Sequence, residues 1–239
     1  MTNQKLEQKI NNQYNAFVQT YIDNLDLMDK PSIELFYSKI PKDLKGKKVL
    51  DVGCGSGQDL LNLQKLGAKA YGIDSSEESI KNAKEIVPGA DLSLGTMNEL
   101  PYPDNYFDMI VSKYALQTSL DVPKALDETT RVLKENGLVI YLTKHPLRQF
   151  LEKKKSPKNY FQQETVESRI FDGKIKLIEP THTEKEYLNP RFLKNFRILD
   201  YDYGYDFPAS EQIEGDTYPC FFTIVAQKIP LPGDWRRYQ

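Results

Sequence analysis

The chain has 239 residues, with 32 Lys and Arg against 34 Asp and Glu and a net charge of −2. This length suits one α/β domain with a full hydrophobic core, and the charge balance lacks the basic excess on which nucleic-acid binding relies. The apolar runs are too short to cross a bilayer, the first residues lack a signal-peptide core, and Cys54 and Cys220 have no metal-ligand spacing. We therefore expect one cytoplasmic domain over residues 1–239, with no nucleic-acid partner, no membrane span and no metal site.

Residues 1–30 carry apolar side chains at helical intervals. This pattern predicts an amphipathic helix, broken once, that ends before Pro31 and covers one side of the domain. Tyr14 and Tyr21 lie on this segment, and their aromatic faces would attract a cation bound beneath them. The alternative is that the segment only packs on the sheet.

A glycine-rich turn follows the first predicted strand, 49–52, and contains Gly53, Gly55 and Gly57. Such a turn leaves backbone N–H groups free at the start of the next helix, where α/β sheets bind nucleotides. The third glycine comes one residue earlier than in the dinucleotide fingerprint, and Gln58 takes the place reserved for glycine. This spacing disfavours a bound pyrophosphate and, with it, a nicotinamide-dependent oxidoreductase.

Asp74 ends the next predicted strand, 68–73. It follows the glycines by roughly twenty residues, the separation from which a carboxylate reaches the two hydroxyls of a ribose. Asp74 and Ser75 also precede a predicted helix, 77–87, whose N-terminus a serine can cap. The two roles are compatible.

A further predicted strand, 107–111, ends at Ser112 and Tyr114. Side chains at the carboxyl edge of a doubly wound sheet face the cofactor, so both residues are candidates for the site. The helix that follows carries Glu128 and Arg131 three residues apart on one face. This spacing predicts a structural ion pair.

Taken together and in this order, four stretches resemble the motifs of the class I S-adenosylmethionine-dependent methyltransferases, and specifically their small-molecule, type 11-like group. The resemblance covers about residues 10–143. The four stretches are the Tyr14 to Tyr21 segment, the Asp-x-Gly-x-Gly-x-Gly run from Asp51, residues 95–108 with their Leu-Pro-Tyr-Pro-Asp-Asn-Tyr-Phe-Asp run, and residues 128–137 with their Arg-Val-Leu-Lys run.

This resemblance implies a Rossmann-like, doubly wound α/β fold whose seven-stranded sheet has the order 3-2-1-4-5-7-6, with strand 7 antiparallel. It also implies S-adenosyl-L-methionine as the cofactor and S-adenosyl-L-homocysteine as the product. Thr96 stands where relatives carry the acid that bonds the adenine amine. The implied cofactor-binding residues are Tyr14, Tyr21, Asp51, Gly53, Gly55, Gly57, Asp74, Ser75, Thr96, Met97, Asn98, Ser112 and Tyr114.

The segment after the fifth predicted strand, 138–143, is the least family-like part. Asp172-Gly173 between two extended stretches is a strong hairpin signal, and we expect residues 145–180 to form a lid with a small antiparallel ribbon. Thr181 or Thr183 would then cap a short helix. The predicted strands 197–203 and 219–228 complete the sheet.

Methyl transfer from a sulfonium is an in-line displacement, so the protein has to position the reactants rather than form a covalent intermediate. His145 and His182 are the two histidines of the chain, and both are candidates for the base or orienting group of the acceptor. Gln117, where relatives often carry His, and Arg148, which suits an acceptor carboxylate, are candidates for the substrate side.

We therefore expect a monomeric or homodimeric enzyme that methylates an O, N or C atom of a small metabolite. The alternative is a protein that has kept the cofactor pocket without turnover and acts as an interaction or regulatory module. The absence of the family acid at Thr96 and of the histidine at Gln117 is the sort of change that such a protein would carry.

Overall fold

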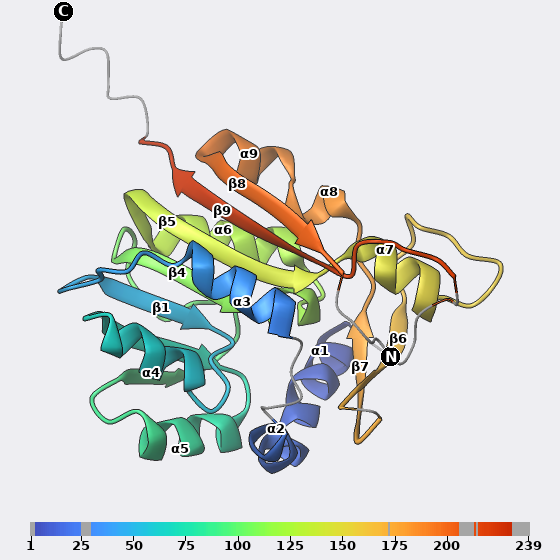
Figure 1. The fold of residues 1–239 in the computed structure, drawn as a ribbon, viewed down its shortest axis with the longest axis horizontal. Helices are drawn as coiled ribbons and strands as arrows, with labels where there is room; N and C mark the ends of the chain where they lie inside the picture. The colour runs from blue at the N-terminus through green and yellow to red at the C-terminus, as the bar shows by residue number, and fades with distance from the viewer. Residues whose placement is uncertain (1–2, 25–29, 172, 206–212, 214, 231–239) are drawn as a thin grey trace, which may run out of the picture.

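The computed structural model describes residues 3–24, 30–171, 173–205, 213 and 215–230. Its centre is a seven-stranded sheet with the order β3-β2-β1-β4-β5-β9-β8 (Figure 1). The neighbours from β3 to β5 pair in parallel, and β9 pairs antiparallel to both β5 and β8. The strands are β1 (Lys48–Val52), β2 (Lys69–Asp74), β3 (Asp91–Leu94), β4 (Phe107–Lys113), β5 (Leu133–Lys144), β8 (Phe196–Gly204) and β9 (Phe221–Lys228).

The predicted strand order is confirmed, because β8 and β9 are the sixth and seventh strands of the expected sheet. The intervening β6 (Thr165–Ile170) and β7 (Ile175–Pro180) form a separate antiparallel ribbon. This ribbon lies in the segment expected to hold one.

Helices cover both faces of the sheet, and two clusters of buried apolar side chains hold these layers together. The helices α6, α8 and α9 pack on one face, and α3, α4 and α5 pack on the other (Figure 1). This is the doubly wound arrangement that the sequence predicts. The helices are α3 (Lys30–Lys39), α4 (Gln58–Lys65), α5 (Glu77–Ile86), α6 (Val122–Val132), α7 (Pro146–Arg148), α8 (Glu184–Tyr187) and α9 (Pro190–Asn195), with short turns η3 (Leu116–Thr118) and η4 (Gln149–Lys153).

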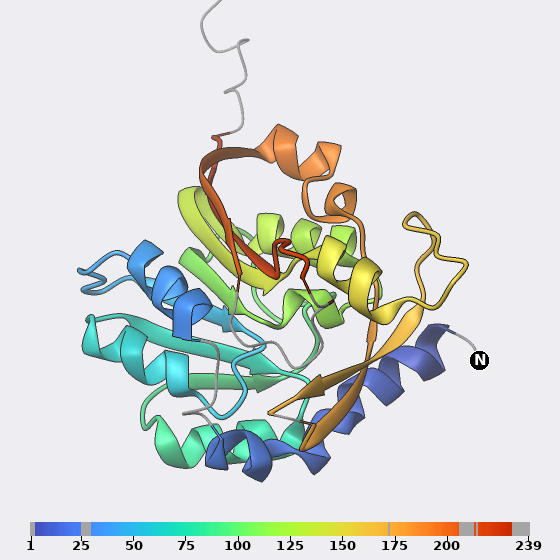
Figure 2. The same cartoon turned by 45° about the vertical axis from the view of Figure 1, so that its right-hand side comes forward.

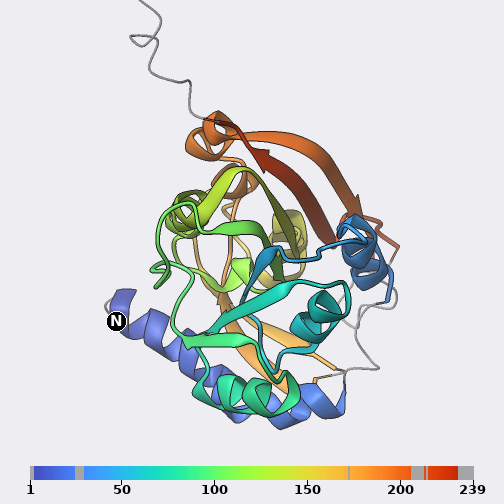
Figure 3. The same ribbon diagram turned by 90° about the vertical axis from the view of Figure 1, so that its left-hand side faces the viewer.

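The N-terminal segment is broken into α1 (Asn3–Asn12), η1 (Gln13–Ala16) and α2 (Val18–Asp23). Figure 2 shows these helices running beside the β6–β7 ribbon, and Figure 3 shows them passing α5, which η1 contacts. The segment and the ribbon therefore lie together at one end of the sheet.

The start of β5 differs from its prediction, since the strand begins at Leu133 rather than at 138. Leu133 pairs with Phe107, and the register shifts before Met109 pairs with Leu138. Asn136, at φ +62°, lies in the irregular stretch between these two pairs. Residues 133–137 are thus a bulged extension of the strand.

None of the described helices combines the length and the apolar character that a bilayer crossing needs. Within the same ranges, no three His, Cys, Asp or Glu side chains gather closely enough to hold a metal ion.

Candidate functional site

Two glycines give the turn between β1 and α4 its shape. Gly53 has φ +79°, and a Cβ there would lie 2.2 Å from the Ala115 Cβ, so the turn packs directly on the chain that leaves β4. Gly55 has φ +51°, and a Cβ there would meet no atom within 4 Å. Residues other than glycine rarely adopt such positive φ values. The first glycine therefore permits packing, whereas the second leaves an open space over the backbone.

Asp74, at the end of β2, fixes this turn from the side. Its Oδ2 accepts a hydrogen bond from the Gly55 N–H at 2.9 Å, and its Oδ1 accepts one from the Ser76 N–H at 2.8 Å. Burial raises the pKa of Asp74, and the bonds from Ser76 and Gly55 limit that rise. Each carboxylate oxygen still has a lone pair for a ligand hydroxyl.

A cavity of about 210 Å³ lies at the carboxyl ends of β1, β2 and β4, between the glycine turn and the N-terminal helices. This is the edge at which doubly wound sheets bind their ligands. The predicted cofactor residues that line it are Tyr14, Tyr21, Gly53, Gly55, Asp74, Ser75, Thr96, Met97, Asn98 and Tyr114.

The other predicted cofactor residues lie behind this cavity rather than on its wall. Gly57 is the N-cap residue of α4. The Ser112 hydroxyl donates to the Val52 carbonyl at 2.8 Å and so joins β4 to β1. Asp51 is buried in β1.

Sequence reasoning missed an ion pair on the cavity wall. Lys113 Nζ lies 2.8 Å from Asp59 Oδ1, both side chains are nearly buried, and the Tyr37 hydroxyl also donates to Asp59. Burial and the Asp59 charge raise the pKa of Asp51 well above its usual range, and Lys113 opposes this rise. Asp51 Oδ2 has no hydrogen-bond partner among the described residues. The sequence could have indicated Lys113 as a site residue, because it ends β4, and ligands bind at that edge of a doubly wound sheet.

Two tyrosines of the N-terminal helices face the cavity from above the glycine turn. The Tyr14 and Tyr21 ring centroids lie 6.4 Å apart, and Tyr21 meets Phe171 edge-on at 5.4 Å. Burial raises the pKa of both hydroxyls, so both remain neutral. The cavity thus has an aromatic cover that is joined to the ribbon.

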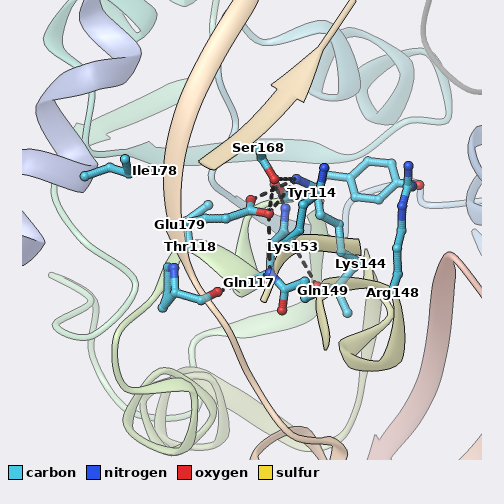
Figure 4. Close-up of polar contacts among 12 residues, drawn as sticks. Tyr114, Gln117, Thr118, Lys144, Arg148, Gln149, Lys153, Ser168, Ile178 and Glu179 are labelled. Atoms are coloured by element: carbon cyan, nitrogen blue, oxygen red, sulfur yellow. Dashed lines mark hydrogen bonds and ion pairs between the residues drawn. The ribbon is translucent and has the colours of Figure 1, made fainter. Parts of the chain in front are cut away.

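A buried polar cluster lies next to the cavity, and Figure 4 shows its side chains converging from β5, β6, β7 and η4. Lys144 Nζ lies 2.8 Å from Glu179 Oε2 and 3.2 Å from Ser168 Oγ, and Gln149 Nε2 donates to Glu179 at 3.3 Å. Burial opposes ionisation of Glu179, but the Lys144 charge and these hydrogen bonds hold its pKa below the usual range. Glu179 is therefore a buried, compensated carboxylate.

The two substrate-side candidates lie beside this cluster. Gln117 donates to the Tyr114 carbonyl at 2.7 Å and accepts from the Thr143 hydroxyl at 2.8 Å. Arg148 Nε lies 3.2 Å from Glu152 Oε2, and Figure 4 shows the Tyr114 ring extending toward this arginine. Tyr114 has φ +52°, a strained backbone conformation of the kind that concentrates at functional sites.

The two histidines are buried and do not line the cavity. His182 Nε2 lies 3.0 Å from the Gln117 carbonyl, and its Nδ1 lies 3.2 Å from Glu186 Oε1, so both ring nitrogens face acceptors. His145 Nδ1 accepts from the Leu147 N–H at 3.2 Å. Burial lowers the pKa of His145, against the opposing charge of Glu184.

Residues 50–141 match the family described as methyltransferase domain. The chain is 35% identical over 118 residues to demethylmenaquinone methyltransferase of Staphylococcus aureus, covering 46% of this chain and 49% of that protein. It is also 35% identical over 95 residues to the uncharacterized methyltransferase YcgJ of Bacillus subtilis, covering 38% of each chain. The chain spans about half or less of the length of the curated relatives it matches.

A solved S-adenosylmethionine-dependent methyltransferase from Mesorhizobium loti has the same fold, with a TM-score of 0.65, 21% identity, and coverage of 82% of this chain and 96% of that one. At this identity the likeness is one of fold. Together with the family match over residues 50–141 and the strand order, it gives the chain a methyltransferase domain with the fold of the S-adenosylmethionine-dependent methyltransferases.

Proposed function

We propose that this protein transfers a methyl group from S-adenosylmethionine to an O, N or C atom of a small metabolite. One observation carries the proposal: the glycine turn, Asp74 and residues 96–98 line a single cavity beneath two tyrosine rings. That arrangement suits a nucleoside joined to a small charged group.

The residues present fit such a cofactor at both ends. Asp74 would accept the ribose hydroxyls, and Thr96 with the backbone of Met97 and Asn98 would lie beside the adenine. The absence of a Cβ at Gly55 leaves room for a ligand to approach the main chain. At the amino-acid end, the ammonium of Lys113 matches a carboxylate, and the Asp59 carboxylate matches an ammonium.

When bound, S-adenosylmethionine supplies an electrophilic methyl group on a sulfonium cation. Tyr14 and Tyr21 would attract that cation through their ring faces, with about 0.5–2 kcal/mol for each ring. They would also exclude water from the cavity. Because the displacement is in-line, the main task of the remaining residues is to orient the acceptor.

We propose that the acceptor binds beside Tyr114 and Gln117, at the end of β4, and that Arg148, which is paired with Glu152, also contacts a carboxylate on it. His182 would act as an orienting group, because it holds the Gln117 carbonyl and so fixes the turn between Tyr114 and Thr118. His145 would stabilise the start of α7, because it is the N-cap residue and its Nδ1 accepts from the Leu147 N–H.

Calorimetric titration of the protein with S-adenosylmethionine and S-adenosylhomocysteine tests the cofactor proposal. Asp74→Ala should weaken binding at least about tenfold, since hydrogen bonds to a charged group contribute about 1.5–3 kcal/mol each. The matched control is Asp91→Ala, because Asp91 is exposed on β3 and does not line the cavity. Equal affinity in the wild type and Asp74→Ala would refute the assignment of the ribose site.

Acceptors can then be screened with a labelled methyl group, beginning with quinones and phenols, because one relative is named a demethylmenaquinone methyltransferase. Tight cofactor binding without transfer to any acceptor would favour the alternative of a cofactor-binding module without turnover.

A further inference from the structure

Within the described residues, β7 pairs with a strand, β6, on one edge, and the side chain of Gln13 from the N-terminal segment bonds its other edge. Gln13 Nε2 donates to the Ile178 carbonyl at 2.8 Å, and the Ile178 N–H donates to Gln13 Oε1 at 2.8 Å. A primary amide offers a donor and an acceptor side by side, as a peptide group does. Gln13 therefore takes the place of a third strand at one position of β7.

The neighbours of these two residues connect the pair to both halves of the site. Tyr14, which follows Gln13, lines the cofactor cavity. Glu179, which follows Ile178, binds Lys144 at the end of β5. Figure 4 shows Ile178 on the side of the N-terminal helix and Glu179 directed into the polar cluster.

Further contacts tie the same segments together on either side of this bond. Lys174 Nζ donates to Asn24 Oδ1 at 2.6 Å, at the turn of the ribbon. The Ser76 hydroxyl donates to Asn15 Oδ1 at 2.7 Å, which links the segment to the N-terminus of α5, two residues beyond Asp74. The N-terminal segment thus contacts both the wall of the cofactor cavity and the ribbon.

We propose that Gln13 is a positioning residue that couples the cofactor cavity to the ribbon, so that cofactor binding orders the ribbon and the Glu179–Lys144 pair before the acceptor arrives. Any such coupling is reciprocal, because a ribbon held in place also holds the aromatic cover over the cofactor. Without the Gln13 amide, the Ile178 N–H and carbonyl lose their partners within the protein and the strand edge opens to water. The proposal rests on the proposed function, in that S-adenosylhomocysteine must bind the cavity.

Hydrogen exchange measured by mass spectrometry, with and without S-adenosylhomocysteine, tests the coupling. In the wild type the cofactor product should slow exchange in β7 by about fivefold or more, the lower end of typical coupling between sites. In Gln13→Ala this response should disappear, and calorimetry should show weaker binding of S-adenosylhomocysteine. Gln8→Ala is the matched control, because Gln8 is exposed on α1 and does not line the cavity.

Gln13→Glu separates coupling from general loss of structure. An ionised carboxylate accepts from the Ile178 N–H but cannot donate to its carbonyl, whereas a protonated carboxyl group can do both. The ordinary pKa of a glutamate is about 4.3, and partial burial raises it. The response of β7 in this variant should therefore recover as the pH falls from about 7.5 to about 4.5, while the wild type measured in parallel does not gain protection.

An unchanged response of β7 in Gln13→Ala, or no response in a wild type that binds S-adenosylhomocysteine, would overturn the coupling and leave the cofactor assignment intact. A folded wild type that does not bind S-adenosylhomocysteine would refute both. If Gln13→Ala does not fold, Gln13→Glu decides the question, and a response that does not depend on pH would count against the proposal.

Discussion

Substituting alanine at Gly53 and at Gly55 should separate the stability of the glycine turn from its binding function. Both residues have positive φ, which costs an alanine about 1–2 kcal/mol. At Gly53 the new methyl group would also overlap the Ala115 Cβ at 2.2 Å. Overpacking of this kind adds about 1–3 kcal/mol. We therefore expect Gly53→Ala to lower the free energy of unfolding by about 2–5 kcal/mol.

Gly55→Ala should behave differently, because its methyl group would meet no protein atom within 4 Å and would project into the cavity. This substitution should lower the free energy of unfolding by about 1–2 kcal/mol. Binding of S-adenosylhomocysteine should weaken at least about tenfold, or about 1.4 kcal/mol, because the methyl group occupies the space over the backbone.

Urea unfolding followed by circular dichroism measures the first quantity, and calorimetry measures the second. Gly89→Ala is the control, since Gly89 has φ +82°, no atom within 4 Å of an added Cβ, and no contact with the cavity. The reasoning is refuted if Gly53→Ala is as stable as Gly89→Ala, or if Gly55→Ala binds S-adenosylhomocysteine with wild-type affinity.

Two further variants test buried polar side chains. Burial raises the pKa of Asp51 above its usual value of 3.8. At a pH between these two values the folded state holds the proton and the unfolded state does not. The free energy of unfolding therefore falls as the pH rises through the native pKa. Asp51→Asn should therefore raise the free energy of unfolding more at about pH 8 than at about pH 4, measured by urea unfolding at both values; an equal change would contradict the shift. His182→Gln should cost about 1–3 kcal/mol of stability, because the buried Gln117 carbonyl and the partly buried Glu186 carboxylate lose a partner. It should also lower turnover without moving the pH profile of kcat, and a displaced profile would show instead that His182 acts as the base of the acceptor.

The central sheet could be predicted from the sequence because its signals are local. The apolar run 49–52, the three glycines and Asp74 follow one another along one β-α-β unit, and each pattern limits the backbone where it occurs. The Glu128–Arg131 pair was likewise predicted from helical spacing, and the structure confirms it at 2.7 Å. Its further bonds were not predictable, since Arg131 also donates to the Leu100 and Tyr102 carbonyls of a distant loop.

The rest of the site depends on contacts between segments far apart in the chain. The Lys113–Asp59 pair requires the register of β4 beside β1, and the Gln13–Ile178 bond joins residues 165 positions apart. No periodicity in either segment carries this information. The start of β5 was missed for the same reason, because Leu133 joins the strand through its pairing with Phe107.

The place of β9 between β5 and β8 has a consequence for how the protein is made. Within the described residues, β8 pairs with β9 alone, and β9 is the last strand of the chain. During synthesis the strands β1 to β5 can therefore assemble first. The strand β8 cannot pair with β9 until residues 221–228 have left the ribosome. A chain that stops short of β9 would keep the cofactor half and present two open strand edges, on β5 and β8, to other nascent chains.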